Sequence, residues 1–194
     1  MEMKRKLFHL ITGILTVFLI YYDIIGIIIL STLVSTLLVL SLLSKRYKIP
    51  LFSSLLKHLE RKENLRKWPA KGTIFFYLGI LICLILFGKE STVVATLILS
   101  IGDPLSNYVG SKYGRIKHPL SKVKNIEGNT AGAAASFLMI IVFKRFFLLN
   151  FSVFTILIAC IIAMFYEGID LPKKLAYYID DNLMLPLIAG LIVW

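Results

Sequence analysis

Hydrophobic residues along this chain form long uninterrupted runs, without the apolar–polar alternation that is typical of half-buried strands. A helix needs roughly 20 residues to cross about 30 Å of hydrocarbon, and fewer where neighbouring helices bury it. The pattern therefore predicts an all-α fold, a polytopic integral membrane protein with about seven transmembrane helices. The predicted spans are Leu7–Tyr22, Ile24–Leu43, Thr73–Phe87, Ser91–Val109, Ala131–Phe143, Phe151–Tyr166 and Leu183–Trp194.

The polar connection at residues 44–71 has a different pattern. Apolar residues recur there at helical spacing with basic residues off the stripe, and Pro50 suits the first turn of a helix. This pattern favours an amphipathic helix on the cytoplasmic membrane surface over a flexible solvated loop. No sequence feature marks a second domain, so residues 1–194 are predicted to form one transmembrane domain. The stripe consists of Leu51, Phe52, Leu55, Leu56 and Leu59.

Basic residues are distributed unevenly between the two sides of the predicted membrane. With the N-terminus in the cytoplasm, 19 of the 22 Lys and Arg residues fall on the cytoplasmic side, and the other side keeps Lys89, Lys144 and Arg145. Membrane proteins carry such an excess in their cytoplasmic loops, so the N-terminus is predicted to be cytoplasmic. This orientation accounts for most of the net charge of +11, and no nucleic-acid partner is expected.

The composition excludes several other classes of protein. With 58% hydrophobic and 17% charged residues, the chain is unlike a soluble domain, in which about half of the residues are apolar and about a quarter charged. Cys83 and Cys160 each lie inside an apolar run, which argues against a disulfide or a metal pair. The three histidines are scattered, so a metal site with His and Cys ligands is not expected.

Asp103 lies inside the fourth predicted span, with Asn107 one turn later on the same helical face. A charged residue at the centre of a span costs about 2.5–3.5 kcal/mol on insertion scales, so each one is a candidate functional group. The order Gly102-Asp103-Pro104 also predicts a helix that restarts, with Asp103 as its N-cap and free N–H groups directed at an anion such as phosphate. The alternative is an aspartate that only caps the helix.

The segment that follows, residues 110–130, is punctuated by glycines and rich in lysine and arginine. Glycines let the backbone approach a ligand closely, and basic side chains suit a polyphosphate. The segment lacks the spacing of a Walker loop, and the orientation rule alone also explains a basic cytoplasmic loop.

Further polar residues adjoin the cytoplasmic ends of the other spans. A single His or Lys at such a place commonly serves as an interfacial anchor. Here, however, they all fall at one face of the bundle together with carboxylates. Carboxylate oxygens suit Mg²⁺ and lysines suit phosphates, so this face is equipped for phosphoryl transfer from a soluble nucleotide to a lipid headgroup or alcohol. These residues are His9, Lys71, Asp103, Glu127, Glu167, Asp180, Asp181 and Asn182.

An ordered set of motifs runs from residue 4 to about residue 190. They are Arg5-Lys6-Leu7-Phe8-His9, Lys71-Gly72-Thr73, Gly102-Asp103 with Gly110 and Gly114, Lys124-Asn125-Ile126-Glu127-Gly128, Glu167, and Asp181-Asn182 with Pro186 and Gly190. This order resembles the CTP-dependent polyprenol kinase family, which includes dolichol kinase, fungal CTP-dependent diacylglycerol kinase and plant phytol kinase. The chain departs from the family pattern at Asn125 and Asn129, where the family often has Ser or Thr.

The resemblance implies a single catalytic domain that transfers the γ-phosphate of CTP, with Mg²⁺, to the hydroxyl of a membrane lipid alcohol. Dolichol or another polyprenol is the expected acceptor, and a diacylglycerol, phytol or geranylgeraniol is the alternative. The active site is expected on the cytoplasmic side of the membrane. The expected partners are therefore CTP, the lipid alcohol and the bilayer.

The expected roles follow from the chemistry of each side chain. Asp103, Glu127 and Asp181 are the expected Mg²⁺ ligands, and either Asp103 or Glu167 accepts the proton of the alcohol. The remaining candidates are expected to bind the nucleotide. They are Lys6, His9, Lys71, Arg115, Lys122, Lys124, Asn129 and Asn182.

Two rival functions stay open from the sequence. A cytidylyltransferase that makes a CDP-lipid would share the nucleotide and the metal. A transporter would use Asp103 as a coupling-ion site, but the outer halves of the spans are mainly Leu, Ile, Val and Phe, which argues against a polar path through the membrane.

Overall fold

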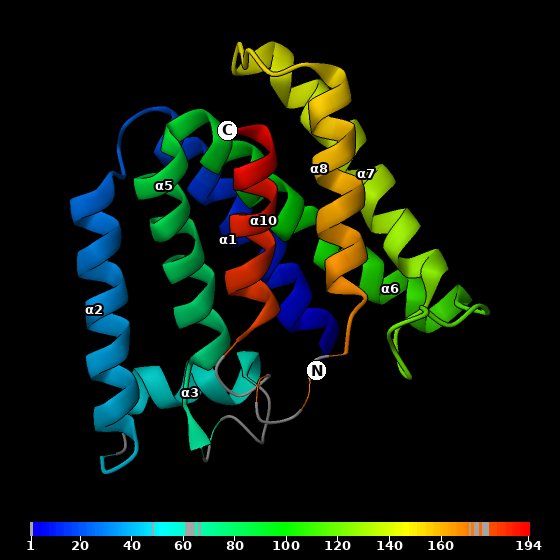
Figure 1. Ribbon diagram of the computed structural model, residues 1–194. Helices are drawn as coiled ribbons and strands as arrows, with labels where there is room; N and C mark the ends of the chain where they lie inside the picture. Colours follow the sequence, from blue (N-terminus) through cyan, green and yellow to red (C-terminus); the bar gives the residue numbers. More distant parts are fainter. Residues whose placement is uncertain are drawn as a thin grey trace.

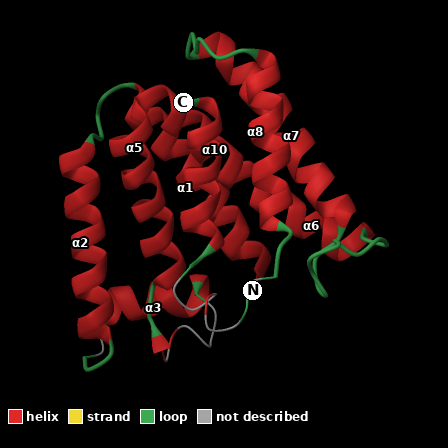
Figure 2. Cartoon of the chain, viewed as in Figure 1, coloured by secondary structure: helices red, strands yellow, loops and turns green. Residues whose placement is uncertain are grey.

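The structure is a computed structural model that describes residues 2–47, 49–60, 65, 67–170, 172, 175 and 179–194. Regular structure in these residues is helical, apart from an isolated β-bridge between Lys117 and Asn125 (Figures 1 and 2). The predicted all-α fold is therefore confirmed. The helices are α1 (Glu2–Tyr21), α2 (Ile27–Ser44), α3 (Pro50–Leu59), α5 (Lys71–Leu97), the π-helix η1 (Ile98–Gly102), α6 (Asp103–Tyr113), α7 (Ile126–Phe146), α8 (Val153–Glu167) and α10 (Asp181–Val193).

Each predicted span overlaps a described helical stretch, with ends that differ by a few residues. The third and fourth spans both fall in the stretch from α5 to α6, which is interrupted at Gly88 with φ +74° and ψ −177°. Only glycine adopts such a conformation readily, so Gly88 separates two helical segments within α5. Among the described residues, three helical stretches are long and apolar enough to cross a membrane, and the apolar helices α8 and α10 are shorter. The number of seven spans, like the single domain, stays a prediction.

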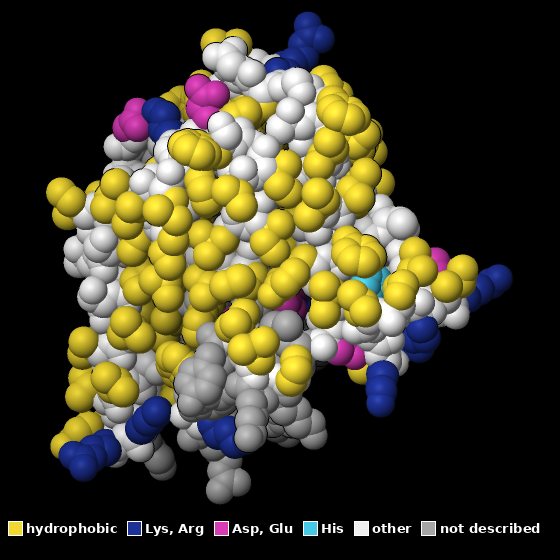
Figure 3. Space-filling view, in the orientation of Figure 1, with side chains coloured by type: hydrophobic (Ala, Val, Ile, Leu, Met, Phe, Trp, Pro, Cys, Tyr) yellow, Lys and Arg dark blue, Asp and Glu magenta, His cyan; other side chains and the backbone are white. Residues whose placement is uncertain are grey.

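Polar contacts at one end of the bundle hold together three connections that the sequence assigns to the outer side. Lys89 Nζ lies 2.7 Å from Asp23 Oδ2, and the Asn150 N–H donates to Glu90 Oε2 at 3.4 Å. Figure 3 shows a broad belt of hydrophobic side chains between this end and the other, where Lys and Arg gather. The two ends are thus chemically distinct, as the charge distribution predicts. Which end faces the cytoplasm stays a prediction.

The predicted amphipathic helix corresponds to α3, and Pro50 is its first residue. Leu56 is buried, whereas Leu51 is 78% and Leu55 47% exposed. One side of α3 therefore packs on the bundle, while the other offers leucines to the surroundings. Several basic residues used to predict the orientation lie outside the described residues. They are Lys48, Arg61, Lys62, Arg66, Lys173 and Lys174.

Glycines bring α6 and α7 into close contact. Gly128 and Gly132 lie one turn apart on α7, and a Cβ at Gly132 would lie 2.7 Å from the carbonyl oxygen of Gly102. A Cβ at Gly128 would lie 3.0 Å from the Cα of Gly110. Small residues at such spacing let helix backbones approach closely within a membrane. This crossing fixes the position of α6, which carries Asp103.

We therefore expect Gly132→Val to destabilise the protein, because its side chain would force α6 and α7 apart. Overpacking of this kind costs about 1–3 kcal/mol. Thermal unfolding of the detergent-solubilised protein measures the change. Ala134→Val is the matched control because Ala134 is exposed on the same helix. Equal unfolding temperatures for the two variants would contradict the close helix crossing.

Candidate active site

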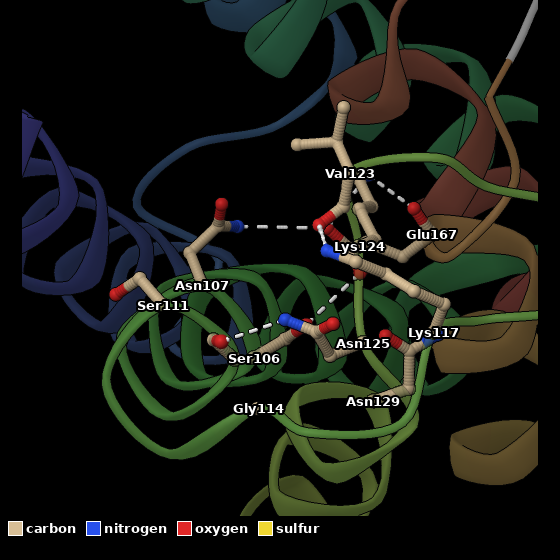
Figure 4. A pocket seen from close by; sticks show the side chains of 11 residues that line it. Ser106, Asn107, Ser111, Gly114, Lys117, Val123, Lys124, Asn125, Asn129 and Glu167 are labelled. Carbon is tan, nitrogen blue, oxygen red and sulfur yellow. Dashed lines mark hydrogen bonds and ion pairs between the residues drawn. The ribbon is translucent and has the colours of Figure 1, made fainter.

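A pocket of about 410 Å³ opens beside α6 and α7 at the end of the bundle opposite Gly88. Its walls are formed mainly by hydroxyl, amide, lysine and glycine residues from α6, the following loop, the start of α7 and the end of α8 (Figure 4). The lining residues are Ser106, Asn107, Gly110, Ser111, Gly114, Lys117, Val123, Lys124, Asn125, Asn129 and Glu167.

Glu167 is the carboxylate among the residues that line the pocket, and 1% of its surface is exposed. The Ser106 hydroxyl donates to Glu167 Oε2 at 2.9 Å, and Lys124 Nζ donates to Oε1 at 2.8 Å. Asn107 Nδ2 lies 3.5 Å from the same Oε1 atom. Figure 4 shows Asn107 and Lys124 directed at this carboxylate from two sides. A buried carboxylate needs such partners because desolvation disfavours its charge.

Lys124 links the ends of two helices. Besides Glu167 it contacts Asp181 Oδ2 at 3.2 Å, at the start of α10, and it also donates to the main-chain oxygen of Glu167. Burial disfavours the charged form of Lys124, but the adjacent Glu167 and Asp181 carboxylates outweigh this effect and raise the pKa of its ammonium group. Lys124 is therefore cationic throughout the neutral range.

Asp103 lies on the other side of Asn107. Asn107 Nδ2 donates to Asp103 Oδ1 at 2.8 Å, and Lys6 from α1 forms an ion pair with Oδ2. Asp103 is 7% exposed. Asn107 therefore connects Asp103 to Glu167, and Lys124 connects Glu167 to Asp181. Three of the expected site carboxylates thus belong to one hydrogen-bonded network, which we call the carboxylate network.

The predicted helix restart at Asp103 is wrong. Gly102 and Asp103 both have right-handed helical dihedral angles, and the Asp103 side chain caps nothing. The π-helix η1 ends at Gly102 instead, and α6 follows it directly from Asp103. Proline lacks an N–H and its ring clashes with the carbonyl four residues earlier, so a widened turn accommodates Pro104 without ending the helix. Asp103 consequently reaches its partners from the side of a continuous helical stretch.

A second polar group lies at the start of α5 and α10. Lys71 Nζ is 3.6 Å from Asp180 Oδ2, and Asn182 Nδ2 donates to the main-chain oxygen of Gly72 at 3.3 Å. Glu60, at the end of α3, is 6% exposed near Gly72 and was not predicted to be part of the site. Lys71 and Asn182 are thus held at the same end as the carboxylate network.

Glu127 is not brought together with Asp103 and Asp181. Its Oε1 atom accepts hydrogen bonds from the N–H groups of Arg115 and Ile116, both at 2.9 Å. Glu127 is an early residue of α7, where its carboxylate satisfies the backbone of the preceding loop. The Glu127 Oε2 atom is buried without a partner among the described residues, and the magnesium role of Asp103, Glu127 and Asp181 stays a prediction. The described part of the chain contains no group of three or more His, Cys, Asp and Glu residues that could hold a metal ion.

The remaining predicted site residues differ in their exposure and in the groups that they contact. The side chains of Arg115 and Lys122 are exposed, and the Lys122 N–H donates to Asp170 Oδ2 at 2.7 Å, which lowers the pKa of that carboxyl. Asn129 donates to the Met164 carbonyl at 2.7 Å, while its Oδ1 atom has no partner among the described residues. His9 packs its ring against Phe76, 4.7 Å away between centroids.

Ser106 is a further site residue that the sequence did not single out. It lies three residues after Asp103, so helical spacing places both on adjacent parts of one face. This spacing is the sequence feature from which Ser106 could have been predicted. No signal marked Glu60, because its burial depends on where the chain folds after α3.

Several known proteins are similar to this chain over much of its length. An uncharacterised protein of Methanocaldococcus jannaschii is 31% identical over 196 residues, which cover 99% of this chain and 92% of that protein. CTP-dependent diacylglycerol kinase 1 of Saccharomyces cerevisiae is 24% identical over 98% of this chain and 71% of the yeast protein. The chloroplastic farnesol kinase of Arabidopsis thaliana is 27% identical over 71% of this chain and 45% of the plant protein. The chain belongs to the CTP-dependent polyprenol and lipid kinase family.

The family resemblance inferred from the motifs is thereby confirmed. No family model and no solved structure matches the chain. In this member of the kinase family, motif residues that are far apart in the sequence meet at one end of the bundle. Lys6, Asp103, Lys124, Glu167 and Asp181 all belong to the carboxylate network or pair with it.

We expect Lys124→Met to destabilise the kinase by about 3 kcal/mol, because it leaves the buried Glu167 carboxylate without its cation. The raised pKa of Lys124 means that its contribution to folding is complete below the ordinary lysine pKa of about 10.4 and is lost as the pH rises above it. Thermal unfolding across a pH series should show a larger alkaline loss in the wild type than in the variant, which keeps the ion pairs of Lys6 and Lys71.

Lys122→Met is the control, because Lys122 is an exposed lysine of the same loop. Its unfolding temperature should stay close to that of the wild type. Equal stability of the Lys122 and Lys124 variants would disprove the structural role of the ion pair.

Proposed function

We propose that this protein transfers the γ-phosphate of CTP to the hydroxyl group of a membrane lipid alcohol, with dolichol or another polyprenol as acceptor. The observation that carries the proposal is the carboxylate network, which places Asp103, Glu167 and Asp181 with two lysines beside a polar pocket. Phosphoryl transfer depends mainly on positioning and on charge neutralisation, which such an arrangement supplies. Membership of the CTP-dependent lipid kinase family supports the donor and the class of acceptor.

The donor atoms of the network fit Mg²⁺. Asp103 Oδ1 and Glu167 Oε1 both approach the Nδ2 atom of Asn107, so two carboxylate oxygens converge on one small region. Mg²⁺ prefers oxygen ligands and is commonly held by one or two carboxylates together with substrate phosphates. Asp103 and Glu167 would hold the ion, with Asp181 nearby. When bound, the ion neutralises charge on the transferred phosphoryl group.

Lysines around the pocket would hold the triphosphate. Lys117 and Lys124 line the pocket, and Lys6 and Lys71 lie at the same end. A lysine ammonium is a mobile point charge that can exchange a carboxylate for a phosphate oxygen. The network therefore keeps Lys6 and Lys124 in place before the nucleotide arrives.

The proton of the acceptor hydroxyl would go to Asp103 or Glu167, the two carboxylates nearest the pocket residue Asn107. Both carboxylates are largely shielded from water, which limits competing hydrolysis of the nucleotide. The lipid chain would lie along the hydrophobic belt of the bundle (Figure 3).

A diacylglycerol is the second candidate acceptor. The yeast relative named as a diacylglycerol kinase matches 98% of this chain, whereas the plant farnesol kinase matches 71%. The longer match favours a glycerolipid, while the order of motifs led us to expect a polyprenol.

We expect Asp103→Asn to lower CTP-dependent lipid phosphorylation at least about a hundredfold, because the carboxylate that pairs with Lys6 is lost. Radiolabelled CTP and a polyprenol in detergent micelles measure the transfer. Glu90→Gln is the matched control, because Glu90 lies at the opposite end of the bundle and should keep full activity. Wild-type turnover by the Asp103 variant would refute this role.

A panel of acceptors tests the lipid. Dolichol, diacylglycerol, farnesol and phytol are each offered with CTP or ATP, and the released nucleotide is analysed. A kinase releases CDP, whereas a cytidylyltransferase releases pyrophosphate. We expect CDP, dependence on CTP and the highest rate with a polyprenol. Pyrophosphate as the product would disprove the kinase proposal, and a higher rate with diacylglycerol would replace only the acceptor.

A further inference from the structure

The segment between α6 and α7, residues 114–125, projects from the side of the bundle next to the pocket (Figure 1). We call it the arm. Three of its large aliphatic side chains point outward, since Ile116 is 61%, Leu120 53% and Val123 73% exposed. Single exposed aliphatic residues are common on protein surfaces, but three within eight residues form a group that needs a covering partner.

The arm is a defined structure, so these exposures are a property of its fold. The His118 N–H donates to the Lys124 carbonyl and the Ile126 N–H to the Ile116 carbonyl, each at 3.0 Å. Asp170 binds the arm from outside, since the Leu120 carbonyl accepts from the Asp170 N–H at 3.0 Å. The arm therefore resembles a short hairpin whose main chain is largely hydrogen-bonded. A satisfied main chain lowers the cost of contact with an apolar phase.

His118 is the arm residue that faces the bundle. It is 3% exposed, and its ring packs against Phe165 of α8 with 4.7 Å between centroids. Its Nδ1 atom accepts from the Leu120 N–H at 3.2 Å. With His118 directed at the bundle, Ile116 and Leu120 on either side of it are directed away.

Basic residues alternate with the aliphatic ones. Arg115, Lys117 and Lys122 are exposed on the arm, and Lys112 is exposed just before it. The nearby carboxylates Glu127 and Asp170 are engaged by main-chain N–H groups of the arm. The outward surface of the arm thus combines aliphatic side chains with positive charge, which suits the headgroup boundary of an anionic bilayer.

The position of the arm also agrees with an anionic bilayer as its partner. The arm and the amphipathic helix α3 lie at the same end of the bundle, on different sides of it (Figure 1). Figure 3 shows hydrophobic and basic side chains side by side on the part that projects from the bundle, where the hydrophobic belt ends. The arm therefore lies where the surface of a surrounding bilayer would be.

We propose that the arm inserts Ile116, Leu120 and Val123 into the membrane interface and binds anionic phospholipid headgroups through Arg115 and Lys122. The arm also supplies the pocket residues Lys117, Val123 and Lys124. Contact with lipid would therefore fix one wall of the pocket at the membrane surface, where the hydroxyl group of a lipid alcohol lies. The proposal concerns the location of the arm and does not depend on which reaction the protein catalyses.

A spin label on Val123→Cys tests the proposal in the full-length protein in lipid nanodiscs. Cys83 and Cys160 are buried, so the label reacts at the new cysteine. Accessibility to oxygen and to a water-soluble nickel complex is compared with two references. Leu138→Cys, 64% exposed on α7, reports the lipid phase, and Asn150→Cys, exposed between α7 and α8, reports water.

In nanodiscs of phosphatidylcholine with phosphatidylglycerol, we expect the label at position 123 to favour oxygen over nickel, approaching the Leu138→Cys value. In phosphatidylcholine alone the preference for oxygen should fall. The double variant Arg115→Gln with Lys122→Gln, carrying the same label, should lose the difference between the two lipid mixtures. Accessibility equal to that of Asn150→Cys, or an equal result in both mixtures for the parent, would overturn the proposal.

Discussion

A carboxylate buried at the end of an apolar bundle must be neutralised where it lies, and the arrangement of this protein depends on that constraint. An unpaired buried charge costs several kcal/mol, so Glu167 at 1% exposure requires its cation and its hydroxyl donor together. Ser106 comes from α6 and Lys124 from the loop before α7, and Lys124 in turn binds Asp181 at the start of α10. One buried charge thereby ties together four parts of the chain.

The same constraint makes the candidate site nearly neutral before any nucleotide binds. Asp103 is paired with Lys6, while Glu167 and Asp181 share Lys124. An incoming triphosphate would bring negative charge to a place where lysines are already oriented. The cost of ordering those side chains is met during folding, which is how preorganised sites lower the barrier to reaction. Stability and function would then rest on the same ion pairs.

The fold was largely predictable because hydrophobic run length decides where helices can span a membrane. The predicted break between Phe87 and Ser91 coincides with Gly88. A connection between two spans needs polar residues and a residue such as glycine that readily adopts a positive φ. Asp103 was predictable because a carboxylate in an apolar helix is costly. The backbone conformation around Asp103 was not predictable, because the choice between a helix restart and a π-helix before Pro104 depends on packing that the local sequence does not encode. The contacts of Glu127 were not predictable, because the two N–H groups that bind its Oε1 atom belong to a loop eleven and twelve residues earlier.

The π-helix has a consequence for the rotational phase of α6. A π-turn accommodates one more residue than an α-turn, and each residue of an α-helix turns the chain by about 100°. The five residues of η1 therefore set the direction in which Asp103, Ser106 and Asn107 all face. A chain shortened by one residue within η1 would keep every site residue and the apolar length of the span, yet would turn those three side chains away from α1 and α8. The chemistry of the site depends on its own residues, but its assembly depends on the number of residues in η1, which contributes no side chain to the carboxylate network.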